Sequence, residues 1–416
     1  MEKKITIIGG GVIGLCTAYY LNKEGHQVTI IDKSDITEGA SFVNAGYLTP
    51  SHIIPLASPG MILKGIKWMF NSSSPFYMKP RIDLDFFKWS WYFHRASTKA
   101  KVEKAIPLIK DINLLSRELF EDIKSSGDIG SFHFERKGLL MLYKTDAAGE
   151  EEMQVANRAK QLGLEVQTLN KQQLSLIEPG VQINAKGAIH YECDGHMTPT
   201  EFMPKMLQYL KNNGVVIKTN EEVLDVVMEG NSVSKIQTTK GSCTTDEVVL
   251  AAGSWSGILA KKLNIKLPIE SGKGYRINVE RPTGISMPAI LMEAKVAVTP
   301  MMGFTRFAGT MEFSGINSVI RKNRVETIAR AANDFYPEIE INQEELADVQ
   351  SGLRPVSPDG LPYIGRHDRI KNLTIATGHA MMGWSLGPAT GKLVTEIIDT
   401  KKTSLNIELL SPSRKF

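Results

Sequence analysis

The stretch KKITIIGGGVIGLCTAYYLNKEGHQVTIID, residues 3–32, predicts a buried β-strand, a glycine turn, an α-helix and a second, parallel strand. Gly9, Gly11 and Gly14 stand in GxGxxG spacing, which allows a tight turn, close approach of a pyrophosphate, and close packing of the helix on the strand. The N-terminus of the expected helix offers free N–H groups to that anion. Asp32 ends the second strand, where a carboxylate binds ribose hydroxyls. The stretch therefore indicates a βαβ unit that binds a dinucleotide, with NAD and FAD both open at this point.

Composition places this unit in an ordinary globular protein. A length of 416 residues predicts about two domains, and 42% hydrophobic with 23% charged residues is typical of such folds. A net charge of +4 gives no argument for a nucleic-acid partner. Cys16, Cys193 and Cys243 form neither a disulfide framework nor a metal-binding pattern, so we expect a reducing compartment and no metal site. The first strand leaves no room for a signal peptide, and no apolar run reaches the ~20 residues of a membrane span, which predicts a cytoplasmic protein.

The α/β texture of the first segment returns twice later in the chain. We therefore expect a Rossmann-like nucleotide-binding domain made of residues 1–52, 195–262 and 349–416. The two gaps, residues 53–194 and 263–348, are expected to form a β-rich substrate domain with helical insertions. The predicted fold is thus an α/β domain, discontinuous in sequence, beside an α+β domain.

Periodicity predicts several further elements. Residues 132–143 read as a pair of strands that turns near Lys137 and Gly138. The stretch from residue 68 to 93 is rich in aromatic residues and flanked by basic ones, which fits either a membrane-surface contact or packing against a neighbouring domain. Helices are expected at residues 101–125, 150–162, 200–212, 323–334 and 389–398. Aromatic residues of the stretch from residue 68 to 93 include Trp68, Phe70, Phe86, Phe87, Trp89, Trp91, Tyr92 and Phe93.

Several stretches together resemble the D-amino-acid oxidase family of flavoproteins, most closely its bacterial D-amino-acid dehydrogenase and glycine oxidase branches. In chain order they are GGGVIG with Asp32, GASFVNAGYLTP, PLASPG, KWMF, VVLAAGSWSGILAKKL, GKGY, GLRPVSPDGLPYIG and TGHAMMGWSLGPATGKL. The resemblance covers nearly the whole chain. It implies non-covalently bound FAD in an extended form, with the ADP part on the first βαβ unit and the isoalloxazine between the domains.

The resemblance also implies which residues contact FAD. The small residues of the loop at 33–50, which by themselves fit a surface loop equally well, would let the backbone approach the cofactor at Ser41 and the flavin ring at 44–48. Val223 would lie near adenine, and the turn at 378–386 would present N–H groups to the pyrimidine edge of the ring. The expected cofactor contacts are Gly9, Gly11, Val12, Ile13, Gly14, Asp32, Lys33, Ser41, Asn44, Ala45, Gly46, Tyr47, Leu48, Val223, Ala252, Gly253, Trp255, Gly352, Arg354, Gly378, His379, Met382, Gly383, Trp384, Ser385 and Leu386.

Arg354, in the motif GLRP, matches the arginine that pairs with the substrate carboxylate in oxidases of this family. A guanidinium group is a permanently charged, bidentate partner for a carboxylate. Tyr275 is a second candidate, as a hydroxyl over the substrate or as a strand residue of the domain floor. His379 beside the flavin is expected to be a structural or hydrogen-bonding residue more than a catalytic base.

The chain departs from the glycine oxidase pattern at two positions. That branch is expected to place a tyrosine before a proline, where this chain reads Thr299 and Pro300. Its arginine after the Gly-His pair is Met381 here. The chain thus has fewer polar groups to hold the substrate than the glycine oxidase branch. This difference favours the dehydrogenases or an enzyme for cyclic amino acids.

The resemblance implies oxidation of a D-amino acid or cyclic amino acid by hydride transfer from Cα to flavin N5, giving an imino acid and then a 2-oxo acid. Electrons would pass to a quinone or another carrier, with contact at the inner face of the membrane as an option. The alternatives are an oxygen-using glycine or D-amino-acid oxidase, a hydroxyproline-type dehydrogenase, and a flavin-binding subunit of an electron-transfer complex without its own amino-acid site.

Overall fold

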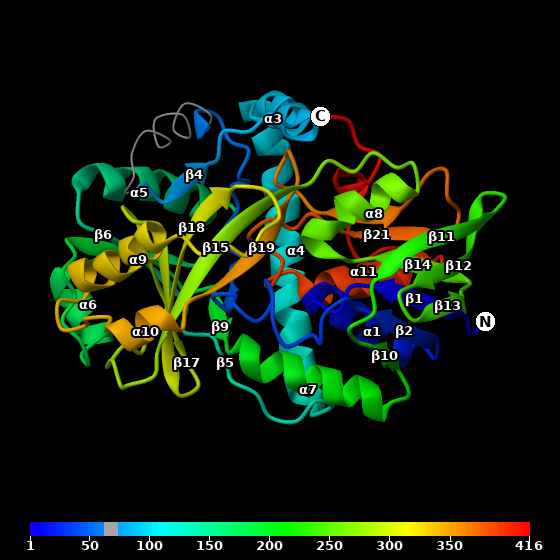
Figure 1. Ribbon diagram of the computed structural model, residues 1–416. Helices are drawn as coiled ribbons and strands as arrows, with labels where there is room; N and C mark the ends of the chain where they lie inside the picture. Colours follow the sequence, from blue (N-terminus) through cyan, green and yellow to red (C-terminus); the bar gives the residue numbers. More distant parts are fainter. Residues whose placement is uncertain (62–73) are drawn as a thin grey trace.

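The computed structural model describes residues 1–61 and 74–416, and within them two large β-sheets lie side by side (Figure 1). The first sheet consists of β10 (Val216–Lys218), β2 (Gln27–Ile31), β1 (Lys4–Ile8), β14 (Glu247–Leu250), β21 (Leu373–Thr377) and β20 (Tyr363–Arg366), in that order. Its neighbours pair in parallel except β20 and β21. The helix α1 (Val12–Lys23) connects β1 to β2, so the predicted βαβ unit is confirmed.

The helix α1 is apolar on nearly every side because it is enclosed on nearly every side. One face lies on the sheet, and the others meet α7 (Pro199–Asn212) and α11 (Gly387–Ile398). The approach of α11 is so close that a Cβ on Gly391 would lie 2.6 Å from the carbonyl carbon of Cys16. A helix that is hydrophobic all round belongs in such an interior position.

The second sheet has nine strands and forms the other half of the molecule. Its strands are β19 (Gln350–Val356), β15 (Glu270–Val279), β18 (Phe304–Phe313), β17 (Val296–Met301), β16 (Ala289–Leu291), β6 (Leu139–Tyr143), β8 (Gly187–Tyr191) and β7 (Val166–Asn170), with β4 (Phe76–Met78) paired on β18. The helices packed on it are α5 (Asp146–Gln161), α6 (Lys171–Ile177), α9 (Lys322–Phe335) and α10 (Gln343–Ala347). β19 belongs to this sheet although it falls in the predicted third nucleotide segment, and the domain boundaries stay a prediction.

The predicted strand pair at residues 132–143 is wrong. The two strands form, but β5 (Phe134–Glu135) pairs with β9 (Gly195–Met197), whereas β6 pairs with β8 and β16. β6 is almost wholly buried and already has a neighbour on each edge, so no edge is left for β5. Together with β3 (Tyr47–Leu48), β5 and β9 make a small third sheet.

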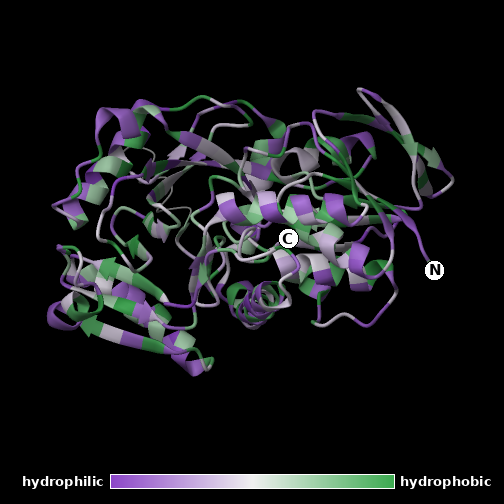
Figure 2. Cartoon of the chain, turned by 90° about the horizontal axis from the view of Figure 1, so that it is seen from below, coloured by the Kyte–Doolittle hydropathy of each residue, from purple (hydrophilic) through white to green (hydrophobic). Residues whose placement is uncertain are grey.

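The remaining elements complete the outer layers. They are α3 (Leu84–Ala96), α4 (Lys99–Ser126), α8 (Ser256–Lys262), the antiparallel strands β11 (Val223–Glu229), β12 (Ser232–Thr238) and β13 (Gly241–Thr244), and 3₁₀ turns at Gly253–Trp255 and Glu408–Leu410. The five predicted helices are confirmed to within four residues at either end. The surface helices alternate hydrophobic and hydrophilic residues, as amphipathic covers of the sheets do (Figure 2).

In the parts of the chain that the structure describes, the helices are all too short or too polar to cross a bilayer. Of the aromatic stretch, Trp68 and Phe70 lie outside the described residues, as does the KWMF motif.

Candidate active site

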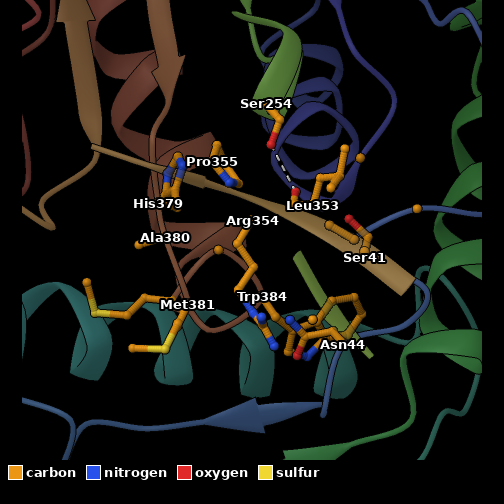
Figure 3. Close-up of a pocket in the computed structure, with 18 of the residues that line it drawn as sticks. Ser41, Asn44, Ser254, Leu353, Arg354, Pro355, His379, Ala380, Met381 and Trp384 are labelled. Carbon is orange, nitrogen blue, oxygen red and sulfur yellow. Dashed lines mark hydrogen bonds between the residues drawn. The ribbon is translucent and has the colours of Figure 1, made fainter. Parts of the chain in front are cut away.

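A cavity of about 1200 Å³ runs between the two large sheets, from the glycine turn after β1 to the strands β15, β18 and β19. Pockets for small ligands usually measure about 300–1,000 Å³, so this cavity has room for a ligand larger than an amino acid alone. Figure 3 shows its central part, into which side chains from several distant segments point.

The glycine turn forms one end of the cavity. Gly9 has φ of +113°, and a Cβ there would lie 2.4 Å from the carbonyl oxygen of Ala251. A Cβ on Gly14 would lie 1.9 Å from the carbonyl oxygen of Gly9, so the turn and α1 fit together only without these side chains. The Asp32 carboxylate accepts the Gly10 N–H at 2.6 Å, as well as the N–H and hydroxyl of Ser34 at 2.8 and 2.7 Å. The turn and the carboxylate are therefore held together at the cavity wall.

The loop after β2 forms a second wall and is anchored at both ends. Ser41 Oγ accepts the Val12 N–H at 3.0 Å, which ties the loop to the start of α1. Arg306, buried on β18, donates to the carbonyl groups of Phe42 and Asn44 at 2.8 and 2.6 Å. Burial lowers the pKa of Arg306 to about 9, which leaves the guanidinium charged at neutral pH. Arg306 was not predicted as a site residue, although a charged residue at an inward strand position was an available signal.

Charged and aromatic side chains close the cavity beyond Asp32. The Lys33 ammonium lies 3.7 Å from the ring centroid of Trp255, a cation–π contact. Burial is the main cause that lowers the pKa of Lys33. Glu221 and Glu222 line the cavity next to Val223, and neither was predicted as a site residue.

Arg354 reaches into the cavity from β19, toward the space bounded by Met381, Trp384 and Asn44 (Figure 3). A Cβ on Gly274 would lie 2.2 Å from Arg354 Nη1, so the guanidinium has room only because position 274 is glycine. Nη1 donates to the Thr310 carbonyl at 3.0 Å.

No carboxylate among residues 1–61 and 74–416 forms an ion pair with Arg354. Burial lowers its pKa to about 10, so the group is still charged at neutral pH. A buried cation without an anion is costly, and an anionic ligand removes that cost.

Two residues that line the cavity, Thr310 and Trp384, each have a buried polar atom without a hydrogen-bond partner within the described chain: Thr310 Oγ1 and Trp384 Nε1. Both side chains are buried, at 8% and 1% exposure. Buried polar groups are normally hydrogen-bonded, so these two side chains are exceptions in the wall of the cavity. Neither atom was predicted as a polar contact, because the sequence gives no signal that their partners are missing.

Tyr275 lines the cavity, but its hydroxyl is already engaged. It donates to Glu312 Oε2 at 2.7 Å, and the same carboxylate pairs with Lys273 at 3.2 Å. Burial and the bond to Glu312 raise the pKa of Tyr275 above its ordinary value. The structure thus supports the interpretation of Tyr275 as a residue of the domain floor.

His379 is buried in the turn before α11, and its Nε2 lies 3.0 Å from Thr390 Oγ1. Burial lowers its pKa to about 3, so the ring is neutral at neutral pH. The next residue, Ala380, has φ of +50° and donates its N–H to the Pro355 carbonyl at 2.8 Å, which joins this turn to the Arg354 strand. His379 therefore lies at a hydrogen-bonded turn, as a structural role requires.

Most of the predicted contacts meet at this one cavity. Those that line it are Gly9, Gly11, Val12, Ile13, Asp32, Lys33, Ser41, Asn44, Ala45, Tyr47, Val223, Ala252, Gly253, Trp255, Gly352, Arg354, His379, Met382, Gly383 and Trp384. Those that do not line it are Gly14, Gly46, Leu48, Gly378, Ser385 and Leu386. Ser385, one of these six, supports the cavity wall through hydrogen bonds: it accepts the Thr49 N–H and donates to Asn113.

The lining fits FAD. A glycine turn and a carboxylate, of the kinds that bind a pyrophosphate and ribose hydroxyls in dinucleotide sites, lie at one end, and the wide space beside Arg354 lies at the other. Gly352 packs closely against the loop after β2, since a Cβ there would lie 2.4 Å from Val43 Cγ2.

The chain is similar over nearly its full length to proteins named D-amino acid dehydrogenase. A D-amino acid dehydrogenase of Neisseria gonorrhoeae (strain NCCP11945) is 30% identical over 418 residues, which cover 99% of both chains. One from Neisseria meningitidis serogroup C / serotype 2a (strain ATCC 700532 / DSM 15464 / FAM18) is 31% identical over 421 residues, again 99% of both. A glycine oxidase structure from Geobacillus kaustophilus has the same fold, with a TM-score of 0.79, 22% identity and coverage of 100% of both chains.

The family model described as DAO, FAD dependent oxidoreductase, matches residues 4–397. Nearly the whole chain is included, and the cavity described above lies within it. The protein belongs to this family of FAD dependent oxidoreductases.

Proposed function

We propose that this protein oxidises a D-amino acid at Cα to the imino acid, which water converts to a 2-oxo acid and ammonia. The observation that carries the proposal is Arg354, a charged guanidinium that lines the cavity without an ion-pair partner in the described residues. An amino acid supplies the missing carboxylate. The names of the Neisseria relatives support the D configuration.

Arg354 binds the carboxylate and so orients Cα. Its position is set by the Thr310 carbonyl and by the room above Gly274. Thr310 Oγ1 and Trp384 Nε1 supply further polar contacts, and Ala297, Ala308 and Met381 give the surroundings an apolar character. We infer a substrate with a small aliphatic or cyclic side chain, such as D-alanine or D-proline.

The other requirements of the reaction are orientation and a neutral amine. Bound FAD supplies the acceptor for the hydride that leaves Cα. The cavity that would hold the substrate is lined by His379, whose ring is neutral at neutral pH because burial lowers its pKa to about 3. Positioning of this kind supplies a large part of the acceleration of a two-partner reaction.

We infer a quinone as the electron acceptor, reached at the inner face of the membrane. The helix α3 supports this inference, because Trp89 and Phe93 line the cavity while Leu84, Phe87 and Trp91 are exposed on the other side of the helix. A lipid-soluble acceptor at this helix would lie within a short distance of the cavity. An oxygen-using oxidase is the alternative, and stoichiometric peroxide with D-alanine would favour it.

The proposal is tested by anaerobic reduction of the bound flavin. Wild-type protein is mixed with D-alanine, D-proline, hydroxyproline, glycine, sarcosine and the L-enantiomers, and flavin absorbance is followed. We expect bleaching by a D-amino acid. In Arg354→Ala, KM should rise by about a hundredfold or more, because a charge-assisted pair contributes roughly 3 kcal/mol.

Arg414→Ala, which breaks the ion pair with Asp359 at 2.7 Å, serves as an arginine control outside the cavity lining, and its KM should be unchanged. Absence of bleaching across the whole panel, with FAD retained, would instead favour an electron-transfer subunit without an amino-acid site.

A further inference from the structure

Two histidines and a glutamate converge on one face of the small sheet, outside the cavity described above. Glu135 of β5 and His196 of β9 are direct partners in the antiparallel register. His133 lies two residues before Glu135, and side chains two residues apart along an extended chain point to the same side. The strand pairing thus brings together residues that are 61 positions apart in the sequence.

The distances between these side chains suit a shared ion. His196 Nε2 lies 3.5 Å from Glu135 Oε2, and His133 Nε2 lies 3.7 Å from the same oxygen. The three ligand atoms all lie within 4.8 Å of one another. Tetrahedral ligands about 2.1 Å from an ion are about 3.4 Å apart, so small rotations of the side chains would complete the geometry.

His196 is the observation that points to a ligand. Its side chain is fully buried, and neither ring nitrogen has a hydrogen-bond partner in the described part of the chain. A neutral imidazole offers a nitrogen lone pair to a metal ion. A fully buried imidazole without partners is unusual, and a metal ion would satisfy it.

The surroundings also fit a metal site. His133 Nδ1 lies 2.8 Å from Thr198 Oγ1, an outer contact of the kind that orients a metal-binding histidine. Glu135 and His133 are partly exposed, which leaves an entry path and a free coordination position. Glu135 is now paired with Lys137 at 2.9 Å, and Lys137 is exposed enough to swing away.

We propose that His133, Glu135 and His196 bind a divalent metal ion of the zinc class. Imidazole nitrogen with carboxylate oxygen is a donor set for such ions, and three protein ligands leave a position for water. The ion would clamp β5 to β9. Because β9 also pairs with β3 at Tyr47 and His196, the clamp would stiffen the strand that carries Tyr47 to the cavity wall.

The test uses untagged, FAD-loaded, full-length protein treated with a chelator and titrated with Co²⁺. We expect one bound ion per chain and a tetrahedral cobalt absorption band to the red of the flavin bands. Glu135→Gln and His133→Gln should each weaken cobalt binding at least about tenfold. Lys137→Met should tighten it, since the competing cation is removed. His94→Gln, at an exposed histidine on α3, is the control and should bind as wild type does.

Two results would overturn the proposal. One is wild-type protein without the cobalt band at saturating Co²⁺. The other is an unchanged band in both Glu135→Gln and His133→Gln. If His133→Gln does not fold, Glu135→Gln and Lys137→Met still decide the matter, because they change the charge balance at a partly exposed position and leave the buried histidine in place.

Discussion

Thr310 adopts a backbone conformation that β-branched residues rarely take. Its φ is +66°, at the point where β18 changes register against β15 between Lys273 and Tyr275. At this irregular backbone the Thr310 carbonyl accepts the Arg354 Nη1–H, and the buried Thr310 hydroxyl has no hydrogen-bond partner among the described residues. Strain of this kind costs about 1–3 kcal/mol and persists where the surrounding structure holds it, often at functional sites.

Replacement of Thr310 separates strain from binding. Thr310→Gly removes the strain, so we expect a free energy of unfolding about 1 kcal/mol above that of wild type or equal to it. The same variant loses the hydroxyl, and KM for the amino acid should rise about tenfold. Urea unfolding and steady-state kinetics measure the two effects. A variant that is clearly less stable than wild type, with unchanged KM, would show that Thr310 only supports the fold.

At the scale of elements, the glycine turn and α1 interlock through Gly14. A Cβ at this position would meet the carbonyl oxygen of Gly9 at 1.9 Å, and neither backbone segment can retreat, since α1 is enclosed by the sheet, α7 and α11. Close helix-on-strand packing is the role that the GxGxxG spacing predicts for its third glycine.

Gly14→Ala should therefore push α1 away from β1. We expect a loss of about 1–3 kcal/mol in the free energy of unfolding and a lower ratio of bound flavin to protein after purification. Gly257→Ala is the matched control, because that Cβ would meet its nearest neighbour, the Leu267 carbonyl oxygen, at an ordinary 3.4 Å in α8. Full flavin retention in Gly14→Ala would contradict the assigned role of the turn.

The helix α3 is amphipathic with large side chains on both faces. Trp89 is buried and donates its Nε1–H to the Val356 carbonyl at 2.9 Å. On the other face, Leu84, Phe87 and Trp91 stand at helical spacing with 83%, 55% and 59% exposure. The helix lies at the edge of the molecule (Figure 1), where a lipid surface can reach it.

Charged substitutions on this face test the membrane contact. We expect the double variant Phe87→Asp with Trp91→Asp to bind anionic phospholipid vesicles at least about tenfold more weakly than wild type, because each aromatic side chain contributes about 1.5–3 kcal/mol on burial. Leu176→Asp, at an 80% exposed leucine on α6, is the control. Equal cosedimentation of all three proteins would contradict a role of α3 in membrane contact.

For the whole molecule, buried neutral histidines couple stability to pH. Burial lowers the pKa of His379 to about 3, and burial with the charge of Lys295 lowers the pKa of His52 to about 4. An unfolded histidine titrates near 6.5. Below that pH the unfolded chain binds more protons than the folded one, so stability is fully present above pH ~6.5 and is lost as pH falls toward 4.

Each of these histidines should reduce the free energy of unfolding by about 1.4 kcal/mol per pH unit between pH 6 and about 4. In His379→Asn the free energy of unfolding should change less steeply with pH, by about 1.4 kcal/mol per pH unit, because asparagine takes up no proton. Urea unfolding at several pH values measures the slopes. The same slope in wild type and His379→Asn would mean that His379 becomes charged in the folded protein.

Local patterns predicted most of the elements but not all of their partners. The βαβ unit and helices such as α4 and α11 were predicted because their periodicity and glycine spacing are properties of short stretches. The prediction that the strands at 134–135 and 139–143 pair with each other was wrong. Pairing depends on which strands distant in the sequence have a free edge, and a short stretch of sequence does not show this.

The sequence by itself determined the βαβ unit, because its strands, helix and glycine spacing lie in one contiguous stretch. The GLRP motif, through the resemblance to the family, made Arg354 the candidate for the substrate carboxylate. Only the tertiary structure decided that the Arg354 guanidinium lies over Gly274 without a carboxylate partner among the described residues. It also decided that Thr310 Oγ1 is unpartnered within residues 1–61 and 74–416, and that His196 meets Glu135 and His133. The physical reason is that burial and missing hydrogen-bond partners arise from contacts between residues far apart in the chain, and these contacts exist only once the sheets have formed.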